Sequence, residues 1–404
     1  MKEGWEYKRF SEISLSISDG DWIEKKDQSD SGIRLIQTGN VGVGKFIPKD
    51  DSQKFITEET FKRLRCSEIF EGDVLISRLP SPLGRSCILP NLDIRCITAV
   101  DCSIVRLNKE VIIPEFFIYY TQSQGYFRKI DGESSGTTRA RITRKKLEQT
   151  EIPLPSLSDQ QSIISRLDTA FAQIDALKAN AEKQLAEARA LFQKALEEAM
   201  KPKEGWEEKR LRDVIDSLRT GLNPRVHFKL NTSDAKGYYI TVRELKGFSF
   251  EVDNKTDRIN EAAIKRINER SNLEIGDVLY SGTGTIGRTA IVRELPTWWG
   301  IKEGVYAITP KKAAIDSYFM VYTMHSDSFN RKVMSKTSGT TVRSIPMKEL
   351  KEITIPVPTL DDQHCIVSHL DSLSAKVRQL EEVERKTIVE CDALKQAMLR
   401  EVFE

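Results

Sequence analysis

The chain contains an internal repeat, and this repeat limits the folds that it can adopt. Residues 134–168 (SSGTTRARITRKKLEQTEIPLPSLSDQQSIISRLD) and 337–371 (TSGTTVRSIPMKELKEITIPVPTLDDQHCIVSHLD) are identical at 17 of 35 positions without a gap. Two shorter matches lie upstream: EGWEYKRF from Glu3 corresponds to EGWEEKRL from Glu204, and GDVLIS from Gly72 corresponds to GDVLYS from Gly276. A repeat of this length predicts two similar units in tandem, each of about 200 residues.

Each unit is predicted to hold a globular domain followed by a long helix. The globular domains are predicted at residues 1–157 and 204–360, and the helices at residues 158–203 and 361–404. Domains of about 150 residues are large enough to bury a core of their own. The fold class predicted is α+β, with two mixed α/β domains, two long helices and a pseudo-two-fold internal repeat.

Hydrophobic patterning gives a coarse outline of the first domain. Strands are predicted at Ile33–Thr38, Asp73–Ser77 and Ile104–Leu107, and a helix at Pro114–Lys129. The prolines of IPLPSLS (152–158) favour extended backbone, and Ser158 with Gln161 is typical of a capping box at a helix start.

Each long helix carries one apolar stripe. In the first helix the stripe is formed by Ile163, Leu167, Phe171, Ile174, Leu177, Ala181, Leu185, Ala188, Leu191 and Ala195, at steps of three or four residues. The two stripes are expected to cover each other as a coiled coil. Because the first helix leaves the first domain and ends at the second, and the second helix leaves the second domain, we expect an antiparallel pair.

Positive charge gathers around the SGTT segment of both copies. Residues 128–146 hold seven Lys or Arg against two Asp or Glu, and residues 331–349 hold five against one, although the whole chain is nearly balanced at 62 to 60. Local basic patches of this kind are typical of phosphate contact.

The sequence has no apolar run of membrane-spanning length and no recognisable signal peptide, and its six cysteines show no framework spacing, so a reduced cytoplasmic protein is predicted.

Three enzyme motifs are incomplete, and no cofactor or metal site is predicted. GNVGVGKF has Phe46 where a phosphate-binding loop needs Ser or Thr. GTGTIG from Gly282 corresponds to RLPSPLG in the first unit, which keeps only the last glycine. Asp234, Glu244 and Lys246 have the loose spacing of a metal-dependent nuclease without its preceding proline. The pattern favours binding over catalysis, so no catalytic residue is assigned.

The repeated motifs carry a family resemblance. An SGTT loop, an I-P-x-P-x-L-x-D-Q helix entry and a long helix, all present twice, closely resemble the specificity (S) subunit of type I restriction–modification systems. The resemblance covers the whole chain. It implies that each globular domain is a target recognition domain that reads one half of an asymmetric bipartite DNA sequence.

The resemblance also implies partners. They are double-stranded DNA, two methyltransferase (M) subunits docked on the coiled coil, and restriction (R) motor-nuclease subunits; no membrane partner is expected. The coiled coil would set the unread spacer between the two half-sites. The subunit itself would be non-catalytic, because methyl transfer and ATP hydrolysis belong to the partner chains.

Residues with suitable side chains near the repeated loops are predicted to contact DNA. Hydroxyls and arginines of the SGTT segments suit phosphate or guanine contact, and Gln37 and Asn40 suit adenine. In the second unit Thr241 and Arg243 stand in the stretch that corresponds to Gln37–Asn40. The full predicted set is Gln37, Asn40, Arg78, Arg85, Thr137, Thr138, Arg139, Arg141, Thr241, Arg243, Arg288, Thr340, Thr341 and Arg343.

Two other classes of function remain open on the sequence. One is a stand-alone DNA-binding or regulatory protein without enzymatic partners. The other is an autonomous nuclease that depends on Asp234 and Glu244. Stable assembly with a methyltransferase distinguishes the first from a specificity subunit, and metal-dependent cleavage by the purified chain distinguishes the second.

Overall fold

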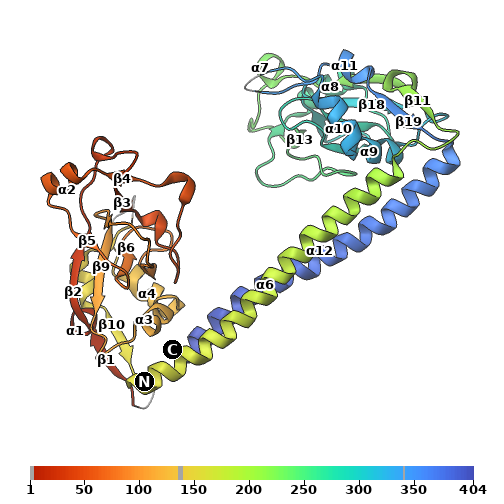
Figure 1. The fold of residues 1–404 in the computed structure, drawn as a ribbon. Coiled ribbons are helices and arrows are strands. Elements are labelled where there is room, and N and C mark those ends of the chain that lie inside the picture. Colours follow the sequence, from red (N-terminus) through yellow and green to blue (C-terminus); the bar gives the residue numbers. More distant parts are fainter. Residues whose placement is uncertain (1–3, 135–139, 340–341) are drawn as a thin grey trace. The chain divides into compact units, whose positions relative to one another are not determined.

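The structure is a computed structural model that describes residues 4–134, 140–339 and 342–404 (Figure 1). It divides into two compact units. Unit 1 comprises Met1–Glu182 with Arg385–Glu404, and unit 2 comprises Lys183–Glu384. Each unit therefore holds one globular domain together with parts of both long helices.

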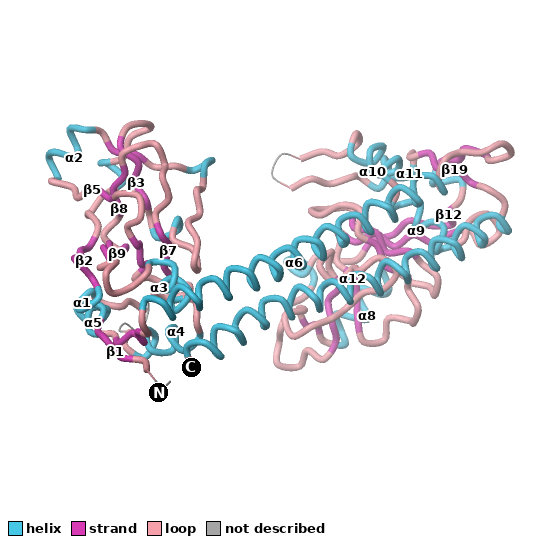
Figure 2. Tube along the Cα trace, turned by 60° about the horizontal axis from the view of Figure 1, so that its bottom comes forward, coloured by secondary structure: helices cyan, strands magenta, loops and turns pink. Residues whose placement is uncertain are grey.

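The two long helices are α6 (Leu157–Ala199) and α12 (Leu360–Phe403). In unit 1, Asp175 pairs with Lys395 at 2.6 Å and Lys178 pairs with Asp392 at 2.7 Å, so residue numbers rise along one helix as they fall along the other. In unit 2, Arg189 of α6 pairs with Glu381 of α12 at 2.6 Å, which shows the same antiparallel order. Both views show the helices side by side (Figures 1 and 2), and the predicted antiparallel pair is confirmed.

The globular domain of unit 1 is built on two four-stranded sheets and a two-stranded ribbon. The first sheet is antiparallel, in the order β2 (Ser14–Asp19), β9 (Cys102–Leu107), β6 (Val74–Ser77), β7 (Ser86–Ile88). The second has the order β4 (Phe55–Ile56), β3 (Ile33–Ile36), β8 (Cys96–Thr98), β5 (Glu68–Ile69), with β3 and β8 parallel. The ribbon pairs β1 (Glu6–Arg9) with β10 (Glu151–Leu154).

The domain of unit 2 repeats this plan with one strand fewer among the described residues. Its antiparallel sheet has the order β12 (Ile215–Thr220), β18 (Val305–Pro310), β15 (Val278–Ser281), β16 (Thr289–Ile291). The second sheet has the order β14 (Arg258–Ile259), β13 (Gly237–Ile240), β17 (Trp299–Ile301). The ribbon pairs β11 (Glu207–Arg210) with β19 (Thr354–Val357). The ribbons pair EYKR (Glu6–Arg9) and EEKR (Glu207–Arg210) with the strands that contain the start of each I-P-x-P motif.

Short helices complete both domains (Figures 1 and 2). Those of unit 1 are α1 (Phe10–Ile13), α2 (Glu58–Leu64), α3 (Pro114–Thr121), α4 (Gln124–Gly132) and α5 (Arg144–Gln149), with 3-10 turns at Lys25–Asp27, Thr38–Asn40 and Asp50–Ser52. Those of unit 2 are α7 (Pro224–His227), α8 (Glu261–Ser271), α9 (Ser317–His325), α10 (Asp327–Met334) and α11 (Met347–Lys351), with a 3-10 turn at Leu211–Asp213.

Two local predictions need correction. The helix predicted at 114–129 is two helices, because the Ser123 side chain accepts a hydrogen bond from the backbone N–H of Tyr126 and starts α4. Helix α6 is capped by Ser156 and not by Ser158: the Ser156 hydroxyl accepts from the Asp159 N–H at 3.2 Å.

The apolar stripe of α6 also differs from the prediction at both ends and in the middle. Leu177 and Leu191 are 52% and 60% exposed, whereas Ile164 and Leu196 are buried. Ile164 belongs to the core of unit 1, and Leu196 belongs to the core of unit 2. The ends of the helix therefore pack on globular domains, and the buried face follows those surfaces as well as the partner helix.

Each domain core includes residues from the C-terminal end of a long helix. These residues come from α12 in unit 1 and from α6 and the residue after it in unit 2. In unit 1, Phe403 of α12 lies 5.4 Å from the ring centre of Phe116, 5.5 Å from Tyr120 and 6.4 Å from Trp5. In unit 2, Met200 occupies the corresponding place beyond α6 and is buried in that core. Aromatic burial of this size is a large stabilising contribution.

Among the described residues, every helix is too short or too polar to cross a membrane. The same part of the chain holds no group of three or more His, Cys, Asp or Glu placed to bind a metal ion.

Candidate nucleic-acid interface

In unit 1, loops from both sheets meet where β3 and β6 end. The turn after β3 carries Thr38, and the loop after β6 leads to Arg85. The Arg85 guanidinium joins them: Nη2 donates to Thr38 O at 2.8 Å, Nε to Val41 O at 2.6 Å, and Nη1 to Leu79 O and Pro82 O. Four backbone carbonyls therefore hold Arg85 between the two loops.

The segment that follows the SGTT loop joins the same edge. Ile142 N–H donates to Arg78 O in unit 1, and Ile345 N–H donates to Gly282 O at 2.9 Å in unit 2. These bonds are equivalent in the repeat. The chain between the SGTT loop and the next helix is thus fixed beside the loop after β6 or β15 in both units.

Five of the predicted contact residues lie outside the described residues: Thr137, Thr138, Arg139, Thr340 and Thr341. The base of the second SGTT loop is described. Ser338 and Ser344 exchange two backbone hydrogen bonds of 2.9 Å, and Gly284 N–H donates to Arg343 O at 2.9 Å. The loop therefore starts and ends at the edge where the other loops meet.

The repeated Gly-Arg pair differs between the units. Gly84 and Gly287 both have the left-handed φ that favours glycine, +82° and +94°. Arg85 is held by four carbonyls, whereas the exposed side chain of Arg288 makes one long hydrogen bond to the described residues, from Nη1 to Val242 O at 3.4 Å. The geometry favours a structural role for Arg85 and leaves Arg288 available to a ligand.

The turns after β3 and β13 are closed by different side chains. Asn40 is buried; its Oδ1 accepts from Gln37 N–H at 2.9 Å and its amide donates to Ile47 O. In unit 2 the corresponding acceptor is Glu244, which accepts from Thr241 N–H at 2.9 Å. Asn40 therefore corresponds to Glu244, as the alignment of QTGN with TVRE implies, and its hydrogen bonds favour a structural role.

Glu244 is held as a charged anchor. Burial would raise the pKa of its carboxyl, but hydrogen bonds from Thr241 and Arg243 hold that pKa below its usual value. Thr241 Oγ1 donates at 2.7 Å and Arg243 Nε at 2.8 Å. Because Glu244 is committed to these donors and Asp234 accepts from Asn260, the described geometry offers no support for the nuclease alternative.

Arg78 is also committed to the protein. Its side chain is almost fully buried, lies 3.3 Å from Asp19 Oδ1 and donates to Val100 O. Burial lowers the pKa of its guanidinium, partly offset by Asp19. A guanidinium in this position favours a structural role over base contact.

The predicted residues that remain exposed or half-exposed at this edge form a polar, cationic set. Arg141 pairs with Asp101 at 2.9 Å and Arg243 is 51% exposed. The set consists of Gln37 and Arg141 in unit 1, and Thr241, Arg243, Arg288 and Arg343 in unit 2. Guanidinium groups suit both phosphate oxygens and the acceptor edge of guanine.

A basic cleft beside α5 was not among the predicted site residues. It has a volume of about 750 Å³ and lies next to the residues that precede and follow the first SGTT loop. Its basic lining residues are Arg9, Lys129, Lys145 and Lys146. The cluster of positive charge in residues 128–146 was the sequence signal for it.

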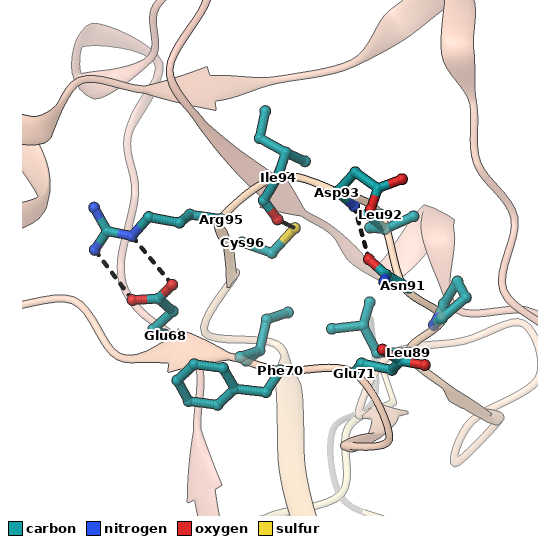
Figure 3. Close-up of a pocket in the computed structure, with 12 residues that line it drawn as sticks. Glu68, Phe70, Glu71, Leu89, Asn91, Leu92, Asp93, Ile94, Arg95 and Cys96 are labelled. Carbon is teal, nitrogen blue, oxygen red and sulfur yellow. Dashed lines mark hydrogen bonds and ion pairs between the residues drawn. The ribbon is translucent and has the colours of Figure 1, made fainter.

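A separate pocket of about 340 Å³ lies at the other end of the β3–β8 pair (Figure 3). It is lined by Phe70, Leu92 and Ile94, and two hydrogen bonds of 3.1 Å join Arg95 to Glu68 at its rim. Since β3 and β8 are parallel, residues before β8 lie opposite the loop that follows β3. This pocket is therefore not part of the candidate interface.

Each unit thus holds a domain of the same plan, with exposed arginines at its loop edge and a connection to the antiparallel long helices. The description of the matching family is type I restriction modification DNA specificity domain, and it covers residues 2–187 and 203–390. The chain belongs to this family.

Relatives agree with that assignment. The EcoKI specificity subunit of Escherichia coli (strain K12) is 24% identical over the whole chain and 89% of its own length. The EcoBI specificity subunit of Escherichia coli is 25% identical over 70% of this chain, and the match spans 64% of that subunit, just under two thirds.

Solved structures share the fold. A chain from work on complex assembly and conformational transition of the type I R-M system covers 100% of this chain and 98% of its own, with 21% identity and a TM-score of 0.77. The HsdS subunit from Thermoanaerobacter tengcongensis covers 100% and 97%, with 20% identity and a TM-score of 0.55.

Proposed function

We propose that the chain is the DNA specificity subunit of a type I restriction–modification complex. Each globular domain reads one half of an asymmetric bipartite target, in line with the predicted domains at residues 1–157 and 204–360. The helix pair separates the domains, sets the unread spacer and docks two methyltransferase subunits, to which restriction subunits add. The chain itself catalyses no reaction.

One observation carries the proposal: the two units share the bonds that fix their loops and differ in the side chains that the loops expose. Ile142–Arg78 and Ile345–Gly282 are the same backbone bond. At the edge that these bonds fix, Gln37 corresponds to Thr241, and a half-buried Arg85 bound to four carbonyls corresponds to an exposed Arg288. Two domains with the same backbone but different exposed hydrogen-bonding side chains read different base sequences.

Sequencing of methylated bases tests the proposal. Host DNA modified by the complex is expected to carry one bipartite motif with two different half-sites and a fixed spacer. Exchange of residues 1–157 for those of another family member should change one half-site only. A palindromic motif, or a change in both half-sites, would contradict the proposal.

The alternative of a stand-alone DNA-binding protein is tested by purification. Co-expression with methyltransferase subunits is expected to give a stable complex. Tight, sequence-specific DNA binding by the chain alone, with no assembly, would favour the alternative.

A further inference from the structure

Helix α6 is tied to the domain that precedes it by a buried glutamine. Gln160 is 0% exposed. Its Oε1 accepts from Ile113 N–H at 2.8 Å, and its Nε2 donates to Val111 O at 3.1 Å and Pro155 O at 3.0 Å. Two of these three partners belong to the loop before α3, so one side chain joins the first turn of the long helix to the globular fold.

Helix α12 has the same attachment in unit 2. Gln363 is also 0% exposed. Its Oε1 accepts from Asp316 N–H at 2.8 Å, and its Nε2 donates to Ala314 O and Pro358 O, both at 2.9 Å. Recurrence of all three bonds in two domains of different sequence indicates a shared requirement at the helix root.

Capping does not explain these glutamines. The hydroxyl of Ser156 accepts from Asp159 N–H, and the hydroxyl of Thr359 accepts from Asp362 N–H, each at 3.2 Å. The free N–H groups of each first turn thus have their own cap. The buried amide of each glutamine therefore serves to join the helix to its domain.

A second attachment follows two turns along each helix. Tyr119 Oη donates to Asp168 Oδ1 at 2.5 Å, and Tyr322 Oη donates to Asp371 Oδ1 at 2.6 Å. Burial and the adjacent carboxylate raise the pKa of both phenols, so each remains a donor. Attachments eight residues apart are separated by about 12 Å along the axis. Two points at this distance fix a direction as well as a position.

The direction matters because each helix is long. A helix of 43 residues measures roughly 65 Å at 1.5 Å per residue, and adjacent base pairs lie about 3.4 Å apart, so a tilt of about 3° at the root moves the far end by one base-pair step. Spacer recognition to a single base pair therefore requires a root that is held within a few degrees.

We propose that Gln160 with the Tyr119–Asp168 pair, and Gln363 with the Tyr322–Asp371 pair, are positioning residues that select the number of unread base pairs. The inference rests on the proposed function, since it assumes that each domain reads a half-site. The residues touch no DNA; they hold each helix at one angle to its own recognition domain.

The test is spacer selection by the complex in cells. Tyr119→Phe with Tyr322→Phe removes one hydrogen bond at each root without changing volume, and the exposed Asp168 and Asp371 remain solvated. Sequencing of methylated host DNA should show the same half-sites. We expect methylation at spacers one base pair longer or shorter to rise about fivefold for each hydrogen bond removed, because a hydrogen bond contributes about 1 kcal/mol.

Gln160→Ala is a stronger variant, and Gln161→Ala is its matched control, because Gln161 is the adjacent residue of the same type and is exposed. The control should keep the wild-type spacer. An unchanged spacer in the double tyrosine variant, or equal loss of methylation at all sites, would overturn the inference. Absence of any bipartite motif with the wild-type complex would instead contradict the proposed function.

Discussion

The loop after β6 in unit 1 and the loop after β15 in unit 2 begin with different residues in the same backbone frame. Arg78 fills the interior of unit 1 and lies against Asp19. Its counterpart Gly282 leaves that space to Tyr306: a Cβ at Gly282 would lie 2.2 Å from the tyrosine ring. Tyr306 Oη in turn donates to Ile345 O at 2.7 Å. The repeat thus preserves backbone bonds while the packing beneath them changes.

The ends of α3 and α9 show the same kind of difference. Gln122 ends the first, and its backbone carbonyl accepts from Gln396 of α12 at 3.2 Å. The corresponding residue in unit 2 is His325, which lies 2.8 Å from Thr289 Oγ1. Equivalent positions therefore carry groups with different chemistry, and the two units should respond differently to mutation and to pH.

The largest expected difference concerns helix docking. Phe403→Ala should destabilise unit 1 by about 3–5 kcal/mol, because it removes a buried ring from an aromatic cluster. Unit 2 should keep its protection, since Met200 fills the equivalent place there. Hydrogen exchange followed by mass spectrometry measures the amide protection of each unit separately. Equal loss of protection in both would show that they unfold as one body.

The next effect separates Arg85 from Arg288. Arg85→Ala leaves several carbonyls without their donor and should cost about 2–3 kcal/mol of stability. Arg288→Ala should cost less than about 0.5 kcal/mol, because its side chain is exposed. Thermal unfolding of both variants measures the difference. Similar losses would mean that Arg288 has structural contacts comparable to those of Arg85.

A binding effect of similar or smaller size is expected at Arg343, which is exposed at the base of the second SGTT loop. Arg343→Ala should weaken DNA binding by the assembled complex by about 1–3 kcal/mol. Relaxed sequence preference in one half-site would indicate base contact, and uniform weakening with a lower salt slope would indicate phosphate contact. Unchanged affinity would remove Arg343 from the interface. Lys351→Ala, at the end of α11, is the control, because it removes one positive charge as Arg343→Ala does.

The last effect is a pH dependence that arises from a buried histidine of unit 2. Burial lowers the pKa of His325 to about 4, against about 6.5 in an unfolded chain. The unfolded state therefore binds the proton more readily, and the contribution is present above about pH 6.5 and is lost as pH falls toward 4. Acidification to about pH 5 should cost unit 2 about 2 kcal/mol, because each pH unit below about 6.5 removes about 1.4 kcal/mol.

His325→Gln supplies the matched control, because it places the unit 1 residue at the unit 2 position. Thermal unfolding at neutral pH and at about pH 5 should show a smaller acid loss in this variant than in wild type. Equal acid loss in the two proteins would assign the pH dependence to other groups.

The repeat and the helix pair could be predicted from sequence because both depend on regular patterns. Seventeen identities over 35 residues and a stripe with steps of three or four persist whatever the detailed packing. The break at Ser123 was missed because the apolar pattern of α3 continues into α4 and a single serine cap ends the first helix. Helix propensity averaged over a window of residues does not detect a single capping hydrogen bond such as that of Ser123.

The candidate interface was predicted less completely, for a related reason. Arg85 and Arg288 are the same residue type after the same glycine, yet one binds four carbonyls and the other is exposed. Gln160 and Gln363 appeared in a helix-entry motif, but their partners lie 47 and 49 residues away in the chain. Such distant partners leave no periodic signal.

The amino-acid sequence by itself determined that this protein has two similar units, two long antiparallel helices and cationic loops at equivalent places, since these follow from repetition, periodicity and composition. Only the tertiary structure decided which polar residues of those loops are scaffold and which face solvent. It also decided that two buried glutamines and two Tyr–Asp pairs hold the helix roots. The physical reason is that burial and hydrogen-bond partnership depend on segments brought together by folding, which neighbouring residues in the chain do not specify.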